Sequence, residues 1–527
     1  MIRVDRLSLA IHGTPILRDV SLSIPKGQIF GLVGESGSGK SMTALSLMQL
    51  LPAGAKATGH ALLDDTDLLT RTEAQMCGLR GNDLGMIFQE PMTALNPVQT
   101  IGDQVAETLL IHGESSRAAA RKIARDRLDR VGLQHVAMDR YPHELSGGQR
   151  QRVCIAAAVA LSPRLLIADE PTTALDVTTQ AQILDLLRDL VARDGMSLLL
   201  ITHDLAVVAN MADHVAVMQR GEIVEQGPTA DVLRLQRHPY TRGLFAASAH
   251  QPDRVTTPGP DVLLSVENVI RTYPGPRTGF TRAAPIAAVD DVSFQLHKGE
   301  SLGLVGESGC GKSTLTRAIL GLDPIQSGAI SAFGHPVTPQ MPNTVRAGIQ
   351  VVFQDPYGSF NPRWRVEKLV AEPFHLLPER PRDARDRVAD ALAAVGLSAD
   401  DMHKYPHEFS GGQRQRIAIA RALITHPRIL VLDEAVSALD VSIRAQILDL
   451  LADLQNRLHL SYLFISHDLT VVRSITDRVL VMQAGKIVEQ GETEQVFTAP
   501  AHPYTQSLLA AAPSLDTIME RSDATLV

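Results

Sequence analysis

The sequence has few cysteines, no long apolar run and no excess of basic residues. Its three cysteines, Cys77, Cys154 and Cys310, form no CxxC pair, which argues against a zinc site and favours a reducing compartment. The longest apolar run that we find, Val153 to Leu161, has nine residues, whereas a membrane-spanning helix needs about 20. The first residues lack the apolar core of a signal peptide. A net charge of −8 gives no basic surface for nucleic acid. We therefore expect membrane association only through partners and no nucleic-acid binding.

An internal repeat divides the 527 residues, which are too many for one hydrophobic core. Lys40 and Lys312 lie in matching motifs 272 residues apart, and His203 and His467 do so 264 residues apart. The stretch from His250 to Pro260 is rich in proline and reads as a short linker. The repeat predicts two homologous domains, with these boundaries: domain 1 at 1–249, a linker at 250–261, domain 2 at 262–515 and a tail at 516–527.

Each half alternates short apolar runs with longer helical stretches. Residues 165–168 form an unbroken apolar run, 197–201 is a serine followed by four apolar residues, and 178–192 and 442–457 have helical patterns. Apolar strands that alternate with helices predict an α/β fold with a parallel sheet covered on both faces. A stretch rich in Pro, Gly and Arg at 274–285 is expected to be an exposed loop.

The chain is organised around two glycine-rich loops that fit G-x-x-x-x-G-K-[ST]. In this pattern backbone N–H groups cradle phosphates, the lysine reaches the β- and γ-phosphates and the serine hydroxyl meets Mg²⁺. Both loops follow an apolar run and precede a helical segment, so the phosphates would lie at a helix N-terminus. The residues are Gly34, Glu35, Ser36, Gly37, Ser38, Gly39, Lys40 and Ser41, and Gly306, Glu307, Ser308, Gly309, Cys310, Gly311, Lys312 and Ser313.

A second motif, S-G-G-Q, also occurs once in each half. A serine followed by glutamine three residues later predicts a capping box at the start of a helix. The two glycines are not needed for capping, and they leave the helix start bare as a docking surface for an anion. The residues are Ser146, Gly147, Gly148 and Gln149, and Ser410, Gly411, Gly412 and Gln413.

Polar residues end several of the predicted strands, where parallel sheets place their sites. An Asp-Glu pair follows an apolar run in each half, and a buried carboxylate pair needs a cation or hydrogen bonds. The aspartate suits Mg²⁺ and the glutamate an attacking water. A glutamine and a histidine end two further strands. These residues are Asp169, Glu170, Gln89 and His203, and Asp433, Glu434, Gln354 and His467.

Taken together, the ordered motifs resemble the ATP-binding cassette (ABC) ATPases over nearly the whole chain. The resemblance implies ATP and Mg²⁺ as cofactors, and two tandem P-loop domains, each with a mainly parallel core sheet, an antiparallel β subdomain and a helical subdomain. It implies Mg²⁺ ligands at Ser41, Gln89, Asp169, Ser313, Gln354 and Asp433. It implies catalytic bases at Glu170 and Glu434 and γ-phosphate sensors at His203 and His467.

In that family the two halves face each other head to tail. The resemblance therefore implies that Ser146 closes over nucleotide at Lys312, and Ser410 over nucleotide at Lys40. Tyr273 fits the aromatic residue that such domains stack on adenine, but the first half has Ile11 at the matching place. We expect weaker ATP binding at Lys40. Phe409 and Ala435 also depart from the usual Leu and Pro, without touching the reacting groups.

Two further motifs are similar to those of the dipeptide, oligopeptide and nickel importer subfamily. They are the segments after each glutamine, 90–97 and 355–362, and the H-P-Y-T motifs at 238–241 and 502–505. A single chain with both ATPases resembles the fused subunits of Yej-type microcin C or peptide importers and of glutathione importers. The resemblance implies two integral-membrane permease subunits, an external solute-binding protein and a peripheral place on the cytoplasmic face of the inner membrane. No cysteine follows either H-P-Y-T motif, so no iron–sulfur cluster is expected.

Three other interpretations stay open at this point. They are a soluble tandem ATPase that acts on the ribosome, a DNA-repair or chromosome ATPase, and an exporter ATPase. The short linker disfavours the first, and the lack of zinc cysteine pairs and heptad arms disfavours the second. The solute cannot be named from the sequence: peptides come first, then glutathione-like or peptide-antibiotic cargo, then nickel complexes.

Overall fold

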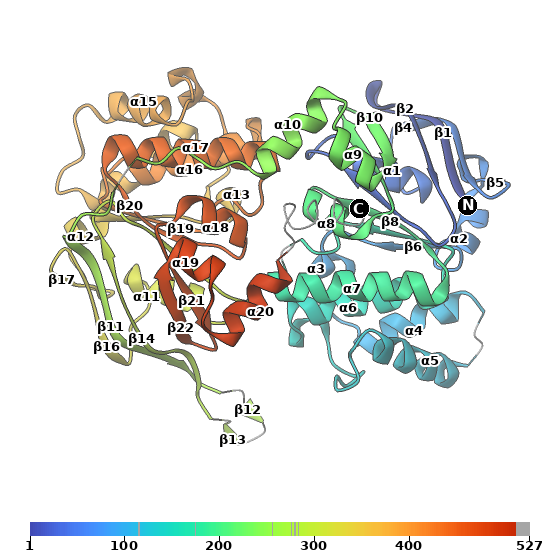
Figure 1. The fold of residues 1–527 in the computed structure, drawn as a ribbon, viewed down its shortest axis with the longest axis horizontal. Coiled ribbons are helices and arrows are strands. Elements are labelled where there is room, and N and C mark those ends of the chain that lie inside the picture. Colours follow the sequence, from blue (N-terminus) through green and yellow to red (C-terminus); the bar gives the residue numbers. More distant parts are fainter. Residues whose placement is uncertain are drawn as a thin grey trace. The chain divides into compact units, whose positions relative to one another are not determined.

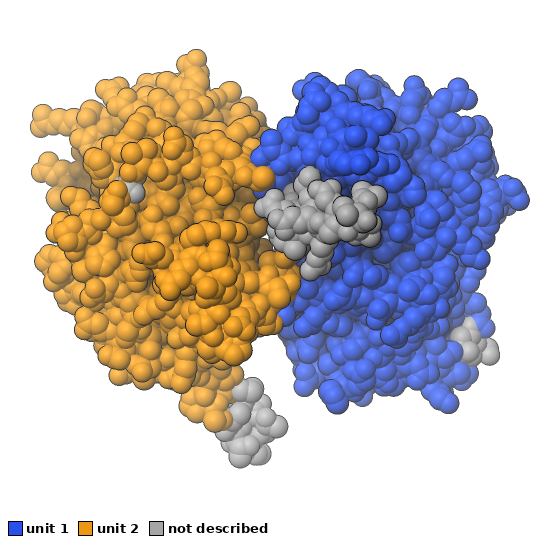
Figure 2. Space-filling model, viewed as in Figure 1, with its two compact units in different colours: residues 1–248, 513–527 blue, residues 249–512 orange. Residues whose placement is uncertain are grey.

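The computed structural model describes residues 1–113, 116–173, 175–255, 257–275, 277–278, 281–282 and 284–512. The chain forms two compact units, here called unit 1 (Met1–Ser248) and unit 2 (Ala249–Ala512), which are coloured separately in Figure 2. Each unit combines a six-stranded and a four-stranded sheet with surrounding helices, and unit 2 adds a two-stranded sheet (Figure 1). The predicted tail at 516–527 lies outside the described residues.

Unit 1 is built on a six-stranded sheet in which all neighbours are parallel except the edge pair β10 and β9. Its order is β10 (Glu222–Pro228), β9 (His214–Gln219), β3 (Ile29–Val33), β8 (Ser197–Thr202), β7 (Leu165–Asp169) and β6 (Leu84–Ile87). An antiparallel sheet adds β2 (Thr14–Ile24), β1 (Ile2–Ile11), β4 (Ala55–Leu63) and β5 (Thr66–Asp67).

The helices of unit 1 fall between these strands, as the alternating pattern predicts. They are α1 (Lys40–Leu47), α2 (Glu73–Leu79), α3 (Pro91–Ala94), α4 (Ile101–Ile111), α5 (Arg117–Arg130), α6 (Gly147–Ala158), α7 (Val177–Asp194), α8 (Leu205–Met211), α9 (Thr229–Leu235) and α10 (Pro239–Ser248), with 3₁₀ turns η1 (Leu68–Thr70) and η2 (Pro142–Glu144). The helices α4 and α5 pack on each other and on α6, forming a helical subdomain.

Unit 2 repeats this plan. Its six-stranded sheet runs β18 (Ile349–Val352), β19 (Ile429–Asp433), β20 (Ser461–Ile465), β15 (Ser301–Val305), β21 (Arg478–Gln483) and β22 (Lys486–Glu492), with β22 antiparallel. Its antiparallel sheet runs β14 (Ile286–His297), β11 (Val262–Tyr273), β16 (Ser327–Ala332) and β17 (His335–Pro336). A short hairpin joins β12 (Arg277–Thr278) to β13 (Thr281–Arg282). This hairpin corrects the expectation of a plain loop at 274–285, because four of its residues pair as strands.

The helices of unit 2 correspond to those of unit 1. They are α11 (Lys312–Ile319), α12 (Asn343–Gly348), α13 (Pro356–Ser359), α14 (Val366–Val370), α15 (Ala384–Ala394), α16 (Gly411–Leu423), α17 (Val441–Leu458), α18 (Leu469–Ile475), α19 (Thr493–Thr498) and α20 (Pro503–Ala511), with 3₁₀ turns η3 (Glu372–Leu376), η4 (Ala399–His403) and η5 (Pro406–Glu408). No helix of the described residues is long and apolar enough to cross a membrane.

The central strands are apolar throughout because both faces of the sheet are covered. In β19, Ile429 and Val431 join the core cluster shared with the antiparallel sheet and α11. Leu430 and Leu432 point to the opposite face and join the cluster that contains residues of α16 and α17. Alternate side chains of a strand point to opposite faces, so an unbroken apolar run is what a doubly covered sheet requires.

The segment predicted as a linker lies along unit 2. His250 contacts Asp449 at 2.6 Å (Nε2 to Oδ1), and the half-buried guanidinium of Arg254 donates to Asp477 at 2.9 Å. The backbone N–H of Gly259 donates to the carbonyl of Lys298. These contacts tie the segment to α17, to the residue before β21 and to the turn between β14 and β15.

Candidate active site

The first glycine-rich loop leads from β3 into α1, and its backbone is one that glycine favours. Gly39 has a φ of 108°, in the left-handed region, and directly precedes Lys40, the first residue of α1. A Cβ at Gly34 would lie 2.2 Å from the carbonyl oxygen of Met218. The Lys40 Nζ donates to the carbonyls of Gly34 and Glu35 at 2.8 and 2.9 Å. The loop is therefore tightly wound, with its lysine amine folded back over it.

The second loop, between β15 and α11, has the same geometry. The Nζ of Lys312 donates to the carbonyls of Gly306 and Glu307 at 2.6 and 2.9 Å. Gly311 has a φ of 115°. Cys310 is 7% exposed, and burial raises the pKa of its thiol, which keeps it protonated and unreactive at neutral pH.

Asp169 and Asp433 end the equivalent strands β7 of unit 1 and β19 of unit 2, at the carboxyl edge of each sheet. Asp169 is 5% exposed and its Oδ1 has no hydrogen-bond partner. Burial raises the pKa of both carboxyls, and in Asp169 a hydrogen bond with Ser41 acts in the opposite direction. A buried carboxylate oxygen without a partner, next to a serine hydroxyl, offers the hard oxygen ligands that Mg²⁺ prefers. The residues at this place therefore fit the metal.

Glu170 and Glu434 follow these aspartates in a left-handed backbone conformation, with φ of 48° and 52°. Such a conformation is uncommon outside glycine and costs about 1–3 kcal/mol, and it recurs where the surroundings hold it in place. Here the backbone N–H of each glutamate donates at 2.8 Å to a carbonyl near the end of the adjacent strand, that of Ile201 in β8 or of Ile465 in β20. The turn aims both carboxylates over the sheet edge.

The predicted histidines meet these glutamates. The Nδ1 of His203 lies 3.3 Å from Oε1 of Glu170, and the Nδ1 of His467 lies 3.3 Å from Oε1 of Glu434. Burial alone would raise the pKa of Glu170, but the hydrogen bond and charge of His203, with other partners, lower it to about 2. The pKa of Glu434 is also lowered, through His467. Both glutamates are thus carboxylates at neutral pH.

The two units differ in the other partners of the glutamate. In unit 1, Nε2 of Gln89 and Oγ1 of Thr173 both donate to Oε2 of Glu170 at 2.9 Å. In unit 2, the hydroxyl of Ser437 donates to the backbone carbonyl of Glu434 instead of its carboxylate. The structure thus brings Gln89 to the glutamate, whereas the sequence interpretation gave it to Mg²⁺.

The S-G-G-Q motifs form the predicted capping boxes. The Ser146 hydroxyl accepts from the backbone N–H of Gln149 at 3.3 Å, and the Gln149 side chain accepts from the N–H of Ser146 at 3.1 Å. Ser410 and Gln413 repeat the arrangement. The helices α6 and α16 begin directly after the capping serine, at Gly147 and Gly411.

A tyrosine that sequence reasoning did not assign to the site contacts each glycine-rich loop. The backbone N–H of Glu35 donates to the hydroxyl of Tyr240 at 3.2 Å, and that of Glu307 donates to Tyr504 at 3.1 Å. Both tyrosines belong to the H-P-Y-T motifs, which begin α10 and α20. The recurrence of the motif at the 264-residue spacing was the available signal, but the spacing does not reveal what the side chain touches.

Tyr273 and Ile11 occupy the same place in the two units, as the last residues of β11 and β1. Tyr273 is 36% exposed, and the guanidinium of Arg271 lies 4.7 Å from the centre of its ring. In unit 1, the ring of His12 follows Ile11 and packs so closely on Gly54 that a Cβ there would lie 2.3 Å from it. Unit 2 therefore has an exposed tyrosine ring at the end of β11. Unit 1 has an isoleucine at the end of β1, followed by the histidine His12.

In each unit, the glycine-rich loop, aspartate, glutamate and histidine meet at the carboxyl edge of one parallel sheet. This arrangement can hold a nucleotide phosphate and a divalent cation and can place a carboxylate near an attacking water. The fold and the paired sites define a tandem P-loop nucleotide hydrolase.

Comparison with known proteins specifies the class further. The chain matches the family model of the ABC transporter over residues 17–173 and 289–437. It matches the model of the oligopeptide/dipeptide transporter, C-terminal region, over residues 224–261 and 488–524, which include both H-P-Y-T motifs. The chain belongs to the ABC transporter family, as the motifs predicted, and is its ATP-binding, ATP-hydrolysing component.

Named relatives extend over nearly the whole chain. The chain is 46% identical to the peptidoglycan transport ATP-binding protein YejF of Agrobacterium fabrum, over 98% of this chain and 97% of that protein. It is 45% identical to the glutathione import ATP-binding protein GsiA of Escherichia coli K12, over 97% of this chain and 88% of that protein. The solved ATP-binding cassette MJ0796, a dimer bound to ADP and Pi, is 29% identical, with a TM-score of 0.40, over 44% of this chain and 99% of that chain.

Proposed function

We propose that the chain is the ATP-hydrolysing subunit of a membrane importer for peptides or peptide-like solutes. The observation that carries the proposal is the doubled match to the oligopeptide/dipeptide transporter C-terminal region, in a chain that holds both ATPases. Relatives named for peptidoglycan transport and glutathione import support the same class of solute. The partners would be two integral-membrane permease subunits and, indirectly, a solute-binding protein, with the chain on the cytoplasmic face of the membrane.

In ATP hydrolysis, different residues of each unit would bind the phosphates, hold the metal ion and activate the water. Lys40 and Lys312 would leave their loop carbonyls and bind the β- and γ-phosphates. Ser41, Gln89 and Asp169, or Ser313, Gln354 and Asp433, would hold Mg²⁺, which neutralises charge on the phosphates. Glu170 and Glu434, ionised at neutral pH, would orient and deprotonate the attacking water, while His203 and His467 hold their carboxylates in place.

Both sites have this full set of residues, so both are proposed to hydrolyse ATP. We further propose that each is completed by the S-G-G-Q motif of the other unit, and that the site at Lys40 binds ATP more weakly. A base stacked on an aromatic side chain gains about 1–3 kcal/mol, or tenfold and more in affinity. The test compares the ATP affinity of two variants. Lys40→Ala reports the affinity of the remaining site at Lys312, and Lys312→Ala reports that of the remaining site at Lys40. Equal affinities would contradict the difference.

Turnover by glutamine variants tests whether both sites are competent. Glu170→Gln and Glu434→Gln should each lower ATP turnover, because removal of a general base costs about 10²–10⁴-fold at its own site. If Glu434→Gln abolished turnover while Glu170→Gln left it unchanged, only one site would be hydrolytic.

The experiment that tests the transport proposal is purification of the tagged chain from membranes in mild detergent. Two multi-span permeases in stoichiometric amounts are expected, and peptide uptake should be lost in cells that carry Glu170→Gln with Glu434→Gln. Recovery of the chain only from the soluble fraction, bound to ribosomes or DNA, would overturn the transport role and leave the ATPase assignment standing. Export lost in place of uptake would favour the exporter alternative.

A further inference from the structure

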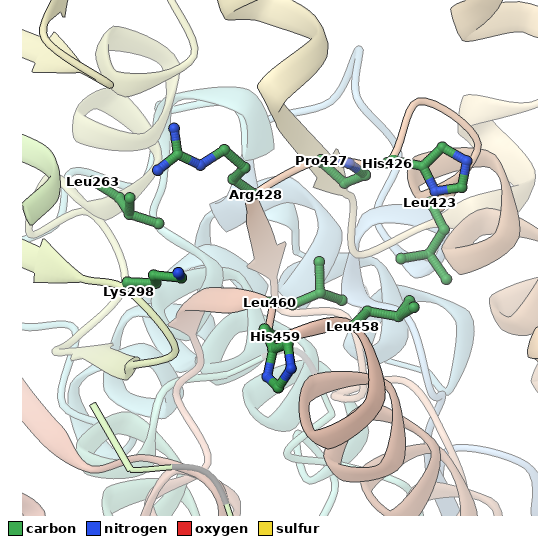
Figure 3. A pocket seen from close by; sticks show the side chains of 9 residues that line it. All are labelled: Leu263, Lys298, Leu423, His426, Pro427, Arg428, Leu458, His459 and Leu460. Carbon is green, nitrogen blue, oxygen red and sulfur yellow. The ribbon is translucent and has the colours of Figure 1, made fainter. Parts of the chain in front are cut away.

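Unit 2 contains a pocket of about 260 Å³ away from its catalytic edge. The pocket lies where α16 and α17 end and where β19 and β20 begin (Figure 3). The catalytic Asp433 is at the other end of β19, roughly 13 Å along the strand at about 3.3 Å per residue. A ligand in this pocket would therefore not touch the nucleotide site.

The floor of the pocket is apolar and well buried. Leu263, Leu423 and Leu460 line it and are only 3%, 6% and 2% exposed. Leu458, the last residue of α17, also lines the pocket and is 48% exposed. The floor can thus receive a small apolar group.

The rim carries basic side chains. Lys298, His426, Arg428 and His459 all line the pocket and are exposed, and none of its lining residues is acidic. In Figure 3, Lys298 and Arg428 lie on one side of the pocket and His426 on the other. Among the described residues, neither Lys298 nor Arg428 forms an ion pair, so their charges are not neutralised within the fold.

Unit 1 provides an internal comparison, because backbone bonds identify the equivalent residues. The N–H of Arg164 donates to the carbonyl of Asp83, as that of Arg428 does to Gly348. In unit 1, the Arg164 guanidinium pairs with Asp64 and, at 3.7 Å, with Asp83. In unit 2, Gly348 stands in the place of Asp83, so this carboxylate is absent there.

The other two carboxylates of this region are also replaced. The backbone N–H of Asp64 donates to the carbonyl of Met1, and the N–H of Phe333 donates in the same way to the carbonyl of Leu263. Phe333 is therefore the equivalent of Asp64. The centre of its ring lies 4.5 Å from the Arg428 guanidinium. Asp194, which ends α7 and pairs with Arg130 at 2.7 Å, is replaced by Leu458. Unit 2 has thus exchanged the two carboxylates that pair with this arginine for phenylalanine and glycine, while it kept the arginine. Asp194 pairs in unit 1 with a different arginine, Arg130.

Helix ends alone do not explain this basic rim. Cations are favoured near helix C-termini, and this accounts for His426 and His459, which follow α16 and α17. It does not account for Lys298, in the turn before β15, or for Arg428, directly before β19. Nor does it account for the loss of carboxylates around an arginine that both units retain.

We propose that this pocket of unit 2 binds a small amphiphilic anion, a carboxylate or phosphate on a short apolar body. The body would lie on Leu263, Leu423 and Leu460, and the anionic group would be held by Lys298 and Arg428. Drug-sized ligands occupy about 300–1,000 Å³, so the ligand here is smaller than those. Unit 1 lacks such a site, because its arginine is neutralised by its own carboxylates.

The test is calorimetric titration of the full chain with octanoate and octyl phosphate, with the nucleotide sites filled by ADP. One molecule is expected to bind per chain. Arg428→Gln and Lys298→Gln should each weaken binding about tenfold, the effect of losing a hydrogen bond to a charged group. Leu458→Asp, which restores the carboxylate of unit 1 at an exposed position, should weaken it at least as much. Thermal melting of each variant checks that it is folded.

Matched controls come from unit 1. Arg164→Gln changes the equivalent arginine, and Leu235→Asp adds a carboxylate at another exposed leucine that ends a helix, α9. Neither should change octanoate binding. Octanol and octylammonium, which have the same tail without the negative charge, should bind at least tenfold more weakly.

Several results would overturn the proposal. Octanol binding as tightly as octanoate would show an apolar pocket without charge selection, and inorganic phosphate binding as tightly as octyl phosphate would show that the apolar floor contributes nothing. Binding that survives Lys298→Gln with Arg428→Gln would place the ligand elsewhere. The chain could instead co-sediment with anionic vesicles, lose this in Lys298→Gln and Arg428→Gln, and fail to bind octanoate. That result would show that these residues contact a membrane surface and that the pocket has no small ligand.

Discussion

Asp169 and Glu170 are adjacent carboxylates on which the fold acts in opposite directions. Burial raises the pKa of Asp169 above its ordinary 3.8, whereas His203 and other partners lower that of Glu170 from 4.5 to about 2. The charge on Asp169 therefore opposes folding, and the charge on Glu170 favours it. The Asp169 charge thus lowers the stability of the chain, which fits a carboxylate placed to bind a cation, and the Glu170 charge raises it, which fits a base that is held in place.

Asp169→Asn should therefore stabilise the chain without nucleotide while lowering ATP turnover. The pKa of Asp169 in the folded chain lies above its ordinary 3.8. The stability of the wild type compared with Asp169→Asn is therefore greatest below pH 3.8, and it falls as the pH rises through the pKa of the folded chain. At pH 7.5 we expect a gain of about 1 kcal/mol, or roughly 2–4 °C in the melting temperature of the unit. Melting curves taken from neutral pH down toward pH 3.8 should show the gain shrinking at the acid end, where Asp169 is protonated in both states.

Two further variants serve as controls for Asp169→Asn. Asp185→Asn changes a carboxylate on α7 whose side chain is 72% exposed, and it should leave the melting temperature unchanged. Glu170→Gln should destabilise at neutral pH, because its lowered pKa gives stability that is present above pH 4.5 and lost as pH falls toward 2. A lower melting temperature for Asp169→Asn would show that the carboxylate is satisfied in the free chain.

At the residue scale the sequence revealed the reacting groups but not their contacts. Glycine, lysine, aspartate and histidine in ordered motifs identify a nucleotide site because each type supplies a definite chemistry. The positive φ of Glu170 and Glu434 and the bond from Gln89 to Glu170 arise from how strand ends meet in space. That geometry depends on neighbours about 80 residues away, which no local pattern records.

At the scale of the element, the starts of α6 and α16 separate folding from function. A Cβ at Gly411 would have nothing within 4 Å, and the position is the first of α16. Gly411→Ala should therefore leave the fold as stable or add up to about 1 kcal/mol, since alanine is the better helix former. We nevertheless expect lower ATP turnover, because the added methyl would obstruct a phosphate that docks on the bare helix start.

The control for this variant is Gly78→Ala, in α2, where a Cβ also meets nothing within 4 Å. It should raise stability by a similar amount and leave turnover unchanged. If Gly411→Ala turned over ATP like the wild type, the motif would be a capping box and nothing more.

The H-P-Y-T helices α10 and α20 are a second element-scale feature, because each places a tyrosine hydroxyl on a glycine-rich loop. Tyr240→Phe removes the acceptor for the backbone N–H of Glu35. We expect the loop to lose about 1 kcal/mol of support, so that ATP affinity at Lys40 falls about fivefold. Nucleotide titration in a Lys312→Ala background isolates that site.

Tyr504→Phe in the same Lys312→Ala background is the matched control, since Tyr504 contacts the other loop. It should leave affinity at Lys40 unchanged. Equal losses in both variants would mean that the tyrosines act on general stability and not on their own loops.

At the scale of the whole molecule, the repeat predicted two α/β domains of one family, and the structure and comparisons confirm the fold and the family. Exchanges between the copies were harder to foresee. The replacement of Asp64 by Phe333 becomes visible when backbone hydrogen bonds align the two units, because this pair departs from the spacing of the repeat. Asp83 and Gly348, and Asp194 and Leu458, keep that spacing, but the sequence does not show that the two aspartates form ion pairs. These positions are scattered over more than 100 residues in each half.

The pairing of the two units can be tested with double variants of the intact chain. If Ser410-Gly411-Gly412 completes the site at Lys40, then Gly411→Ala and Lys40→Ala disable the same site. The double variant should then turn over ATP like Lys40→Ala alone, which is strongly non-additive. Gly411→Ala with Lys312→Ala would disable both sites, and turnover should fall at least about a further tenfold. The reverse outcome, with coupling between Gly411 and Lys312, would mean that each unit completes its own site and that the two act independently.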